Sequence, residues 1–219
     1  MKKVGVVLAG CGVLDGSEIH EAVLTLLFLS QMQAEVQVFA PDKKQRQVIN
    51  HATQQETTES RNVLVESARI ARGNALPLEK LDMAVLDAVI FPGGFGAAKN
   101  LCTFAIDGPH SVIDSAVARV IREAHRREKP IGAMCIAPVL VALAFKETSV
   151  RPRLSVGSDQ EVHAVLAAWQ AETVCAGVAD VVVDEKNKIV TTPAYMLGQT
   201  IAEVAAGIEK LVQEVLRLA

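Results

Sequence analysis

Short apolar, β-branched runs alternate with longer helical stretches along this chain, and the alternation restricts the fold more than any other feature. The apolar runs are KVGVVLA (3–9), EVQVFA (35–40), LDAVIFP (86–92), PIGAMC (130–135), DVVVDE (180–185) and KIVTTP (188–193). Helix-like stretches cover 17–32, 110–128, 135–146, 158–170 and 197–218. Nearly continuous apolar strands are buried on both faces, so the pattern predicts an α/β fold with a mainly parallel sheet between two helical layers. Ligand sites in such sheets lie beyond the carboxyl ends of the strands.

No linker or internal repeat divides the 219 residues, and half of them are apolar, so we expect a single domain spanning 1–219. The stretch 41–80 has no clear apolar period and is expected to be a partly ordered excursion over the surface. The polar residues 186–187 lie between two β-rich runs and predict a hairpin at 180–193. The opening VGVVLAGC imitates a lipoprotein signal, but its apolar segment is shorter than the roughly 7–15 residues of a signal peptide, so a buried strand is expected there.

Charge and cysteine usage exclude several partners. The chain has 22 Lys and Arg against 25 Asp and Glu, with the basic residues scattered, which argues against nucleic acid. No stretch approaches the roughly 18 apolar residues of a membrane span, so no membrane contact is expected. The four cysteines form no C-x-x-C pair, and the histidines do not stand with them at zinc-ligand spacing. We therefore expect reduced thiols, no metal and a cytoplasmic location.

Cys135 stands in PIGAMCIAPVLVALA, between an apparent strand and an apparent helix. Ala133 and Ala137 lie two residues before and after it, which is the pattern of a sharp strand-to-helix turn that exposes a nucleophile. A thiol at a helix N-terminus can have its pKa lowered from about 8.5. The alternative is a buried cysteine that fills a gap in the core. This stretch alone leaves both interpretations open.

The segment IFPGGFGAAKNL (90–101) follows another strand and places three glycines at the head of a helix. Glycines there let backbone amides approach a ligand and stabilise negative charge. The spacing is not the G-x-G-x-x-G of a dinucleotide site, and it comes late in the chain. We therefore predict an oxyanion site with the amides of Gly94 and Ile136 as donors. A tight turn that simply requires glycine is the alternative.

The segment LDGSEIHEAVLTLLFL (14–29) predicts a helix capped by Asp15 or Ser17. Glu21 shares a helical stripe with Leu24, Thr25 and Phe28. A carboxyl group held against apolar surface has a raised pKa and can exchange a proton near neutral pH. The alternative role of Glu21 is to complement the helix dipole.

With these stretches placed, the sequence resembles the PfpI and class I glutamine amidotransferase-like superfamily, which includes the Parkinsonism-associated deglycase, and within it the ElbB family of isoprenoid-biosynthesis (enhancing lycopene biosynthesis) proteins. The resemblance is carried by KKVGVVLAGCGVLDGSEIHEAV, FPGGFGAAKNL, GAMCIAP and TTPAYMLG. It implies a flavodoxin-like three-layer α/β/α sandwich with a nucleophile elbow. It also implies Cys135 as nucleophile, Glu21 as its carboxyl partner, Gly94 and Ile136 as the oxyanion hole, no cofactor, and a homodimer.

Relatives of this kind act on glyoxal and methylglyoxal, so the resemblance implies a cofactor-independent glyoxalase, a lyase whose activity overlaps with deglycase activity. Ile136 stands where peptidase-like members have a histidine, and His163 lacks the glutamate of the late H-x-E of glutamine amidotransferases. Both departures argue against those activities. The motifs place no histidine proton shuttle: His20 projects about 100° away from Glu21 around the helix, and His110 follows the glycine turn at a distance. The alternative function is a redox sensor or regulator without turnover, with Cys11 as a resolving thiol.

Overall fold

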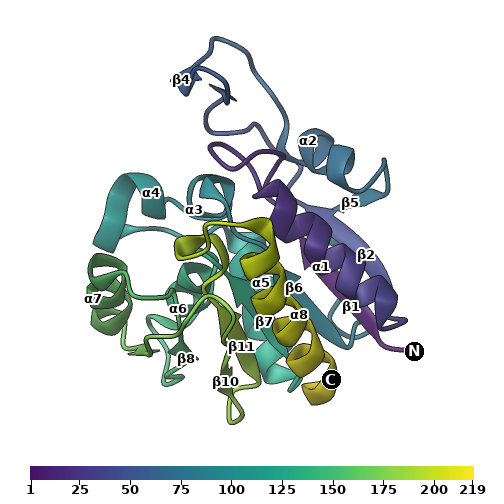
Figure 1. Cartoon of the computed structure of the whole chain (residues 1–219), viewed down its shortest axis with the longest axis vertical. Coiled ribbons are helices and arrows are strands. Elements are labelled where there is room, and N and C mark those ends of the chain that lie inside the picture. The colour runs from purple at the N-terminus through teal and green to yellow at the C-terminus, as the bar shows by residue number, and fades with distance from the viewer.

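The computed structural model describes all 219 residues and contains a seven-stranded sheet with the order β10-β11-β7-β6-β1-β2-β5 (Figure 1). The strands are β1 (Lys3–Val7), β2 (Glu35–Ala40), β5 (Ala75–Pro77), β6 (Ala88–Phe91), β7 (Ile131–Met134), β10 (Val182–Asp184) and β11 (Ile189–Thr192). Neighbouring strands are parallel except for the antiparallel pair β10 and β11. The predicted strands and the predicted hairpin at 180–193 are therefore confirmed.

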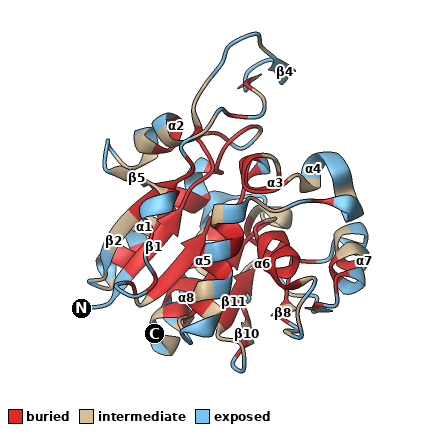
Figure 2. Ribbon diagram, turned by 180° about the vertical axis from the view of Figure 1, so that it is seen from behind, coloured by how far each residue is buried: buried red, intermediate tan, exposed pale blue.

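Helices cover both faces of the sheet, as the flavodoxin-like prediction requires (Figure 1). One layer consists of α1 (Ile19–Gln31), α2 (Val63–Ile70) and α8 (Ile201–Leu218), and the other is built around α5 (Ser115–Arg126) and α6 (Pro138–Phe145) with α7 (Gln160–Ala168) beyond them. Successive residues of a strand face opposite layers, so Val6 enters one core and Val7 the other. Figure 2 shows the strands and the inner faces of the helices buried.

Local sequence explains several helix boundaries. Thr200 and Glu203 form a reciprocal capping box at the start of α8, and Asp114 accepts two backbone N–H groups at the start of α5. Helix α6 consists of eight buried apolar residues, PVLVALAF, and so lies wholly inside the domain. No helix in the structure combines the length and apolarity that crossing a membrane demands.

The stretch 41–80 is more ordered than the sequence suggested. It contains the small hairpin β3 (Ile49–Asn50) and β4 (Gln55–Glu56), helix α2, the edge strand β5 and the 3-10 turn η1 (Leu78–Lys80). The hairpin projects away from the sandwich, whereas α2 and β5 belong to it (Figure 1). Short elements of this kind show no clear periodicity, and β5 ends in a proline that only an edge strand tolerates.

The remaining short elements follow the sheet strands. Helix α3 (Phe95–Asn100) begins directly after the glycine turn, and α4 (Phe104–Asp107) and η2 (Gly108–His110) follow it. Strands β8 (Arg153–Leu154) and β9 (Glu172–Thr173) form a separate parallel pair beside α7. The turn η3 (Ala194–Met196) joins β11 to α8 and, with α3 and α4, borders the carboxyl edge of the sheet.

Candidate active site at the strand-to-helix turn

Cys135 lies at the sharp turn between β7 and α6, where the sequence predicted a nucleophile elbow. Its φ is +58°, a left-handed conformation that is rare outside glycine. Its backbone N–H donates to the carbonyl oxygen of Thr192 at 3.0 Å, which ties the turn to β11. Ala133 and Ala137 are fully buried, so larger side chains at these positions would collide with the core as the chain reverses direction.

The glycine turn brings backbone amides to the Cys135 sulfur. The N–H groups of Gly94 and Ile136 both donate to Sγ. A Cβ atom on Gly93 would lie 2.5 Å from the Cβ of Cys135, and one on Gly94 would lie 2.4 Å from the backbone nitrogen of Glu18. Only glycine allows these close approaches, so packing requires glycine at positions 93 and 94, in addition to any chemical role of the backbone amides. The structure thus brings Gly94 and Ile136 together at the thiol, and their oxyanion role stays a prediction.

Glu21 reaches the same sulfur from the first turn of α1 and is fully buried. Its carboxyl oxygens accept hydrogen bonds from the backbone N–H groups of Gly93 at 2.8 Å and Tyr195 at 3.2 Å, and its side chain hydrogen-bonds the Cys135 thiol. The apolar stripe that the sequence indicated, formed with Leu24, Thr25 and Phe28, is buried with it. Cys135 and Glu21, which are 114 positions apart in the sequence, are therefore direct partners.

The predicted helix cap was wrong. Glu18, not Asp15 or Ser17, is the N-cap of α1, and its carboxylate accepts the backbone N–H of Glu21 at 2.7 Å. The Ser17 hydroxyl instead accepts the N–H of Ala9, and Asp15 accepts the N–H of Ile49 in the projecting hairpin. Because both side chains form hydrogen bonds that hold the loop after β1, neither caps the helix, and the next acceptor along the chain, the Glu18 carboxylate, is the N-cap.

Burial raises the pKa values of both Glu21 and Cys135. The pKa of Glu21 rises to about 7, first because burial disfavours the carboxylate and then because Glu18 is a neighbouring negative charge. Burial and the charge of Glu21 also raise the pKa of the Cys135 thiol, and these effects exceed the lowering by the two amides. The expectation of a thiol pKa lowered by the helix N-terminus was therefore wrong: Cys135 is protonated at rest, with a carboxylate beside it that can accept the proton.

Tyr195 and His20 form a second polar pair at the site, which the sequence reasoning did not assign. The Tyr195 hydroxyl lies 2.7 Å from Nδ1 of His20, and His20 lies 4.0 Å from the Glu18 carboxylate. Tyr195 follows Ala194, whose φ of +45° turns the chain so that the Tyr195 N–H points at Glu21. His20 projects away from Glu21 on α1, as expected, and meets Tyr195 there. His110 is exposed on η2 and is absent from the pocket lining.

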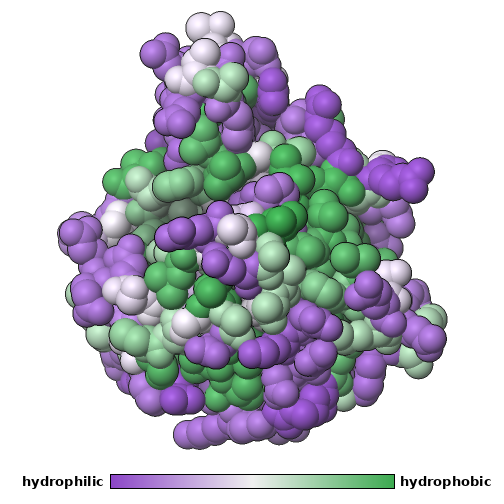
Figure 3. All heavy atoms as spheres, viewed as in Figure 1, coloured by the Kyte–Doolittle hydropathy of each residue, from purple (hydrophilic) through white to green (hydrophobic).

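Cys135 forms part of the wall of an apolar pocket of about 410 Å³. Ten of its twelve lining residues are hydrophobic. The twelve are Val13, Gly94, Phe95, Ala98, Phe104, Ala105, Cys135, Ile136, Asp159, Val162, Tyr195 and Met196. Figure 3 shows hydrophobic surface around a hollow on the face formed by α3, α4 and the turn before α8. The thiol itself is only 8% exposed, so a reactant must enter this pocket to meet it.

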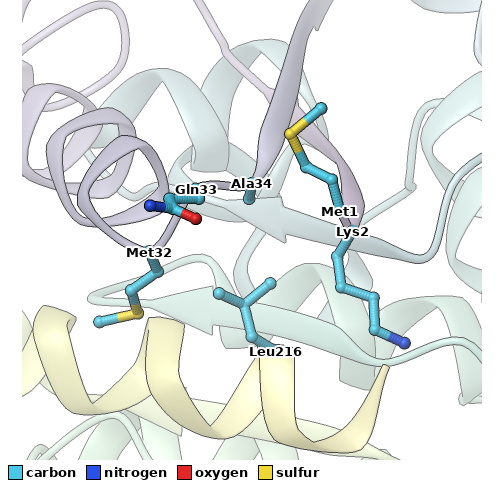
Figure 4. Close-up of a pocket in the computed structure, with 6 residues that line it drawn as sticks. All are labelled: Met1, Lys2, Met32, Gln33, Ala34 and Leu216. Carbon is cyan, nitrogen blue, oxygen red and sulfur yellow. The ribbon is translucent and has the colours of Figure 1, made fainter.

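A second hollow, of about 370 Å³, lies at the opposite edge of the sheet (Figure 4). Met1, Lys2, Met32, Gln33, Ala34 and Leu216 line it at the amino ends of β1 and β2. It contains no cysteine, histidine or carboxylate, and parallel sheets bind ligands at the other edge. The pocket at Cys135 is therefore the better candidate site.

The other cysteines show no such environment. All four cysteines are free thiols. Cys11 lies among Glu66, Arg69 and Asp15, where burial raises its pKa, and it does not line the Cys135 pocket. The structure therefore gives no support for Cys11 as a resolving thiol. No group of three or more His, Cys, Asp or Glu side chains is arranged to hold a metal ion.

The sheet order, the elbow cysteine and the buried glutamate define a class I glutamine amidotransferase-like protein. The rat ES1 protein homolog is 47% identical over 99% of this chain and 84% of its own length, and human glutamine amidotransferase-like class 1 domain-containing protein 3 is 47% identical over 99% and 83%. The chain belongs to the family of these two proteins. No family model matches it.

Solved structures agree with this assignment. An isoprenoid biosynthesis protein with an amidotransferase-like domain from Ehrlichia chaffeensis superposes with a TM-score of 0.92 at 34% identity, over 99% of this chain and all of that one. Drosophila melanogaster DJ-1beta, at 19% identity and a TM-score of 0.55 over 100% of this chain and 95% of its own, shares the fold alone. The predicted superfamily and fold class are confirmed.

The expected cytoplasmic location is contradicted. The rat, human and zebrafish relatives are all named mitochondrial proteins. The expectation depended on reduced thiols, and free cysteines do not distinguish one reducing compartment from another.

Proposed function

We propose that this protein is a cofactor-independent glyoxalase that converts glyoxal, and also methylglyoxal, to the corresponding hydroxy acid. One observation carries the proposal: the Cys135 thiol is hydrogen-bonded to a fully buried carboxyl group whose pKa is about 7, and two backbone amides point at the same sulfur. Such a site can form a sulfur–carbon bond, hold an oxyanion and move a proton near neutral pH.

The first step forms the hemithioacetal. The Cys135 proton passes to the Glu21 carboxylate while the sulfur bonds to one aldehyde carbon, and the carbonyl electron pair becomes an oxyanion. The amides of Gly94 and Ile136 lie within reach of that oxygen because both converge on the sulfur to which its carbon is bonded. Glu21 then returns the proton to the oxygen and is a carboxylate again.

The second step is an internal oxidation and reduction. The Glu21 carboxylate removes a proton from the sulfur-bearing carbon to give an enediol, and Glu21, after exchange of that proton with water in the pocket, delivers a proton to the neighbouring carbon. The first carbon loses its hydroxyl proton to Tyr195 and becomes a thioester, and the second carbon, whose oxygen has gained a proton from Tyr195, becomes an alcohol. No external oxidant is needed. Water then hydrolyses the thioester, which releases glycolate from glyoxal or lactate from methylglyoxal and restores the thiol.

Tyr195 and His20 provide the acid that the second carbonyl oxygen requires as the enediol forms. Tyr195 lines the pocket beside Cys135, and its hydroxyl is hydrogen-bonded to His20, whose side chain is 52% exposed to solvent. This pair takes the place of the histidine shuttle that the sequence motifs did not supply. His20 acts through Tyr195 and is a positioning residue.

The buried thiol favours this proposal over a redox sensor. Sensor thiols are exposed and ionised, because oxidants react with the thiolate. Cys135 is 8% exposed, and its pKa is raised. Homodimer formation stays a proposal, which the molar mass in solution tests.

The test is glycolate formation from glyoxal in D₂O without glutathione. We expect turnover, one deuterium on the product methylene from exchange at Glu21, and a loss of at least about 100-fold in Cys135→Ala and in Glu21→Gln. Cys175→Ala, which changes an exposed thiol, is the matched control. Absence of turnover in the reduced parent protein, or retained turnover in Cys135→Ala, would overturn the proposal.

A further inference from the structure

The lining of the Cys135 pocket points to a narrower substrate class than the glyoxalase chemistry alone. The space of about 410 Å³ falls within the roughly 300–1,000 Å³ range of pockets that bind drug-sized molecules. Glyoxal carries no substituent on either carbonyl carbon and would leave most of this space to water. Hydrophobic side chains gain nothing from contact with that water.

The charges around the pocket restrict the substrate further. No lysine, arginine or histidine is among the lining residues, and the only carboxyl group there, that of Asp159, already accepts the N–H groups of Glu161 and Val162 as the cap of α7. A carboxylate or phosphate on the substrate would lose its hydration without gaining a cation. The lining therefore favours an uncharged apolar substituent.

The groups that the proposed chemistry uses are gathered around Glu21. Cys135, the Gly94 and Ile136 amides and Tyr195 lie together around Glu21, whereas Phe95, Phe104 and Val162 come from α3, α4 and α7. Resting on the proposed function, we infer that the preferred substrate is an uncharged α-oxoaldehyde with a bulky apolar substituent. Its aldehyde carbon meets Cys135, and its substituent occupies the space between α3, α4 and α7.

The test compares kcat/KM for glyoxal, methylglyoxal and phenylglyoxal, measured as glycolate, lactate and mandelate. We expect about a tenfold rise in kcat/KM from glyoxal to methylglyoxal and a further rise to phenylglyoxal. The Val162→Asn change should lower the ratio of phenylglyoxal to glyoxal turnover by about tenfold. The same change at Val165, on α7 but outside the pocket lining, should leave that ratio as it is.

The outcomes separate the two proposals. Turnover of glyoxal without a preference for the apolar aldehydes, or a ratio that Val162→Asn does not change, would overturn this inference and leave the glyoxalase activity standing. Turnover of none of the aldehydes would overturn the proposed function and this inference with it.

Discussion

Cys135 and Ala194 have the same rare left-handed backbone conformation, with φ values of +58° and +45°, at the carboxyl ends of the neighbouring strands β7 and β11. One turn presents the thiol, and the other directs the Tyr195 N–H to the Glu21 carboxyl group that is hydrogen-bonded to the thiol. Strained residues persist where the surrounding structure holds them, and here two of them flank one carboxyl group.

Ala194→Gly tests the strain directly. Glycine relieves the backbone strain of a left-handed alanine, which is worth about 1–2 kcal/mol. This gain should offset two losses: the buried methyl group, about 0.8 kcal/mol, and the greater entropy of the unfolded chain, about 0.5–1 kcal/mol. We expect the free energy of unfolding, from urea denaturation, to stay within about 0.5 kcal/mol of the parent. Ala142→Gly, equally buried but inside α6, should cost about 2 kcal/mol. Equal losses at the two positions would show that Ala194 is unstrained.

Gly93→Ala should affect kcat/KM more than the free energy of unfolding. The added methyl group would lie 2.5 Å from the Cys135 Cβ and 2.8 Å from the Glu21 Oε2, so the thiol and the carboxyl group must separate. We expect a fall in glyoxal kcat/KM of about 100-fold or more, since a displacement of about 1 Å is enough for this. Gly177→Ala, which meets only the flexible Asp180 carboxylate, is the control. Normal turnover in Gly93→Ala would mean that this close approach is not needed for catalysis.

The dependence of kcat/KM on pH should follow the ionisation of Glu21 and should shift when the charge of Glu18 is removed. Because the Glu21 carboxylate must accept the thiol proton, kcat/KM should rise as the pH increases through about 7. Glu18→Gln keeps an oxygen for the Glu21 N–H but removes the negative charge that raises the Glu21 pKa, so the rise should move to lower pH. Glu209→Gln, on the exposed face of α8, should leave the profile in place. An unshifted profile in Glu18→Gln would assign the rise to another group.

Glu21→Gln should change how stability depends on pH. A carboxyl group whose pKa is 4.5 in the unfolded chain and about 7 in the folded protein stabilises the fold below 4.5 and loses that contribution as the pH rises through 7. The loss amounts to about 3 kcal/mol. Glutamine does not ionise, although it sacrifices one of the two backbone hydrogen bonds. The free energy of unfolding of Glu21→Gln minus that of the parent should therefore increase by about 3 kcal/mol between pH 4.5 and pH 8. Parallel curves would contradict the raised pKa.

Tyr195→Phe and His20→Gln test the second polar pair. Loss of the Tyr195 hydroxyl should lower kcat by about 100-fold, as expected for a general acid, and His20→Gln should lower it less and alter the pH profile. Since His20 acts through Tyr195, the double variant should be no slower than Tyr195→Phe alone. His110→Gln, at an exposed position, is the control. Independent, additive losses would show that the two residues do not act as a unit.

Sequence patterns predicted correctly those features that depend on residues close together in the chain. The alternation of strands and helices, the small residues around Cys135 and the apolar stripe beside Glu21 each depend on neighbours a few positions away, because helix and strand periods place those residues on one face. The same reasoning missed α2 and β5, whose eight and three residues are too short to show a period.

The tertiary structure alone decided the chemistry of the site. Helix position suggested an ionised Cys135, but burial and Glu21 reverse the direction of its pKa shift, and both depend on which distant segments pack around the sulfur. Tyr195 and His20 are 175 positions apart, and no local pattern joins them. The sequence determined which chemical groups the chain carries and which elements hold them; desolvation and Coulomb interactions, which follow distance in space rather than along the chain, determined what those groups can do.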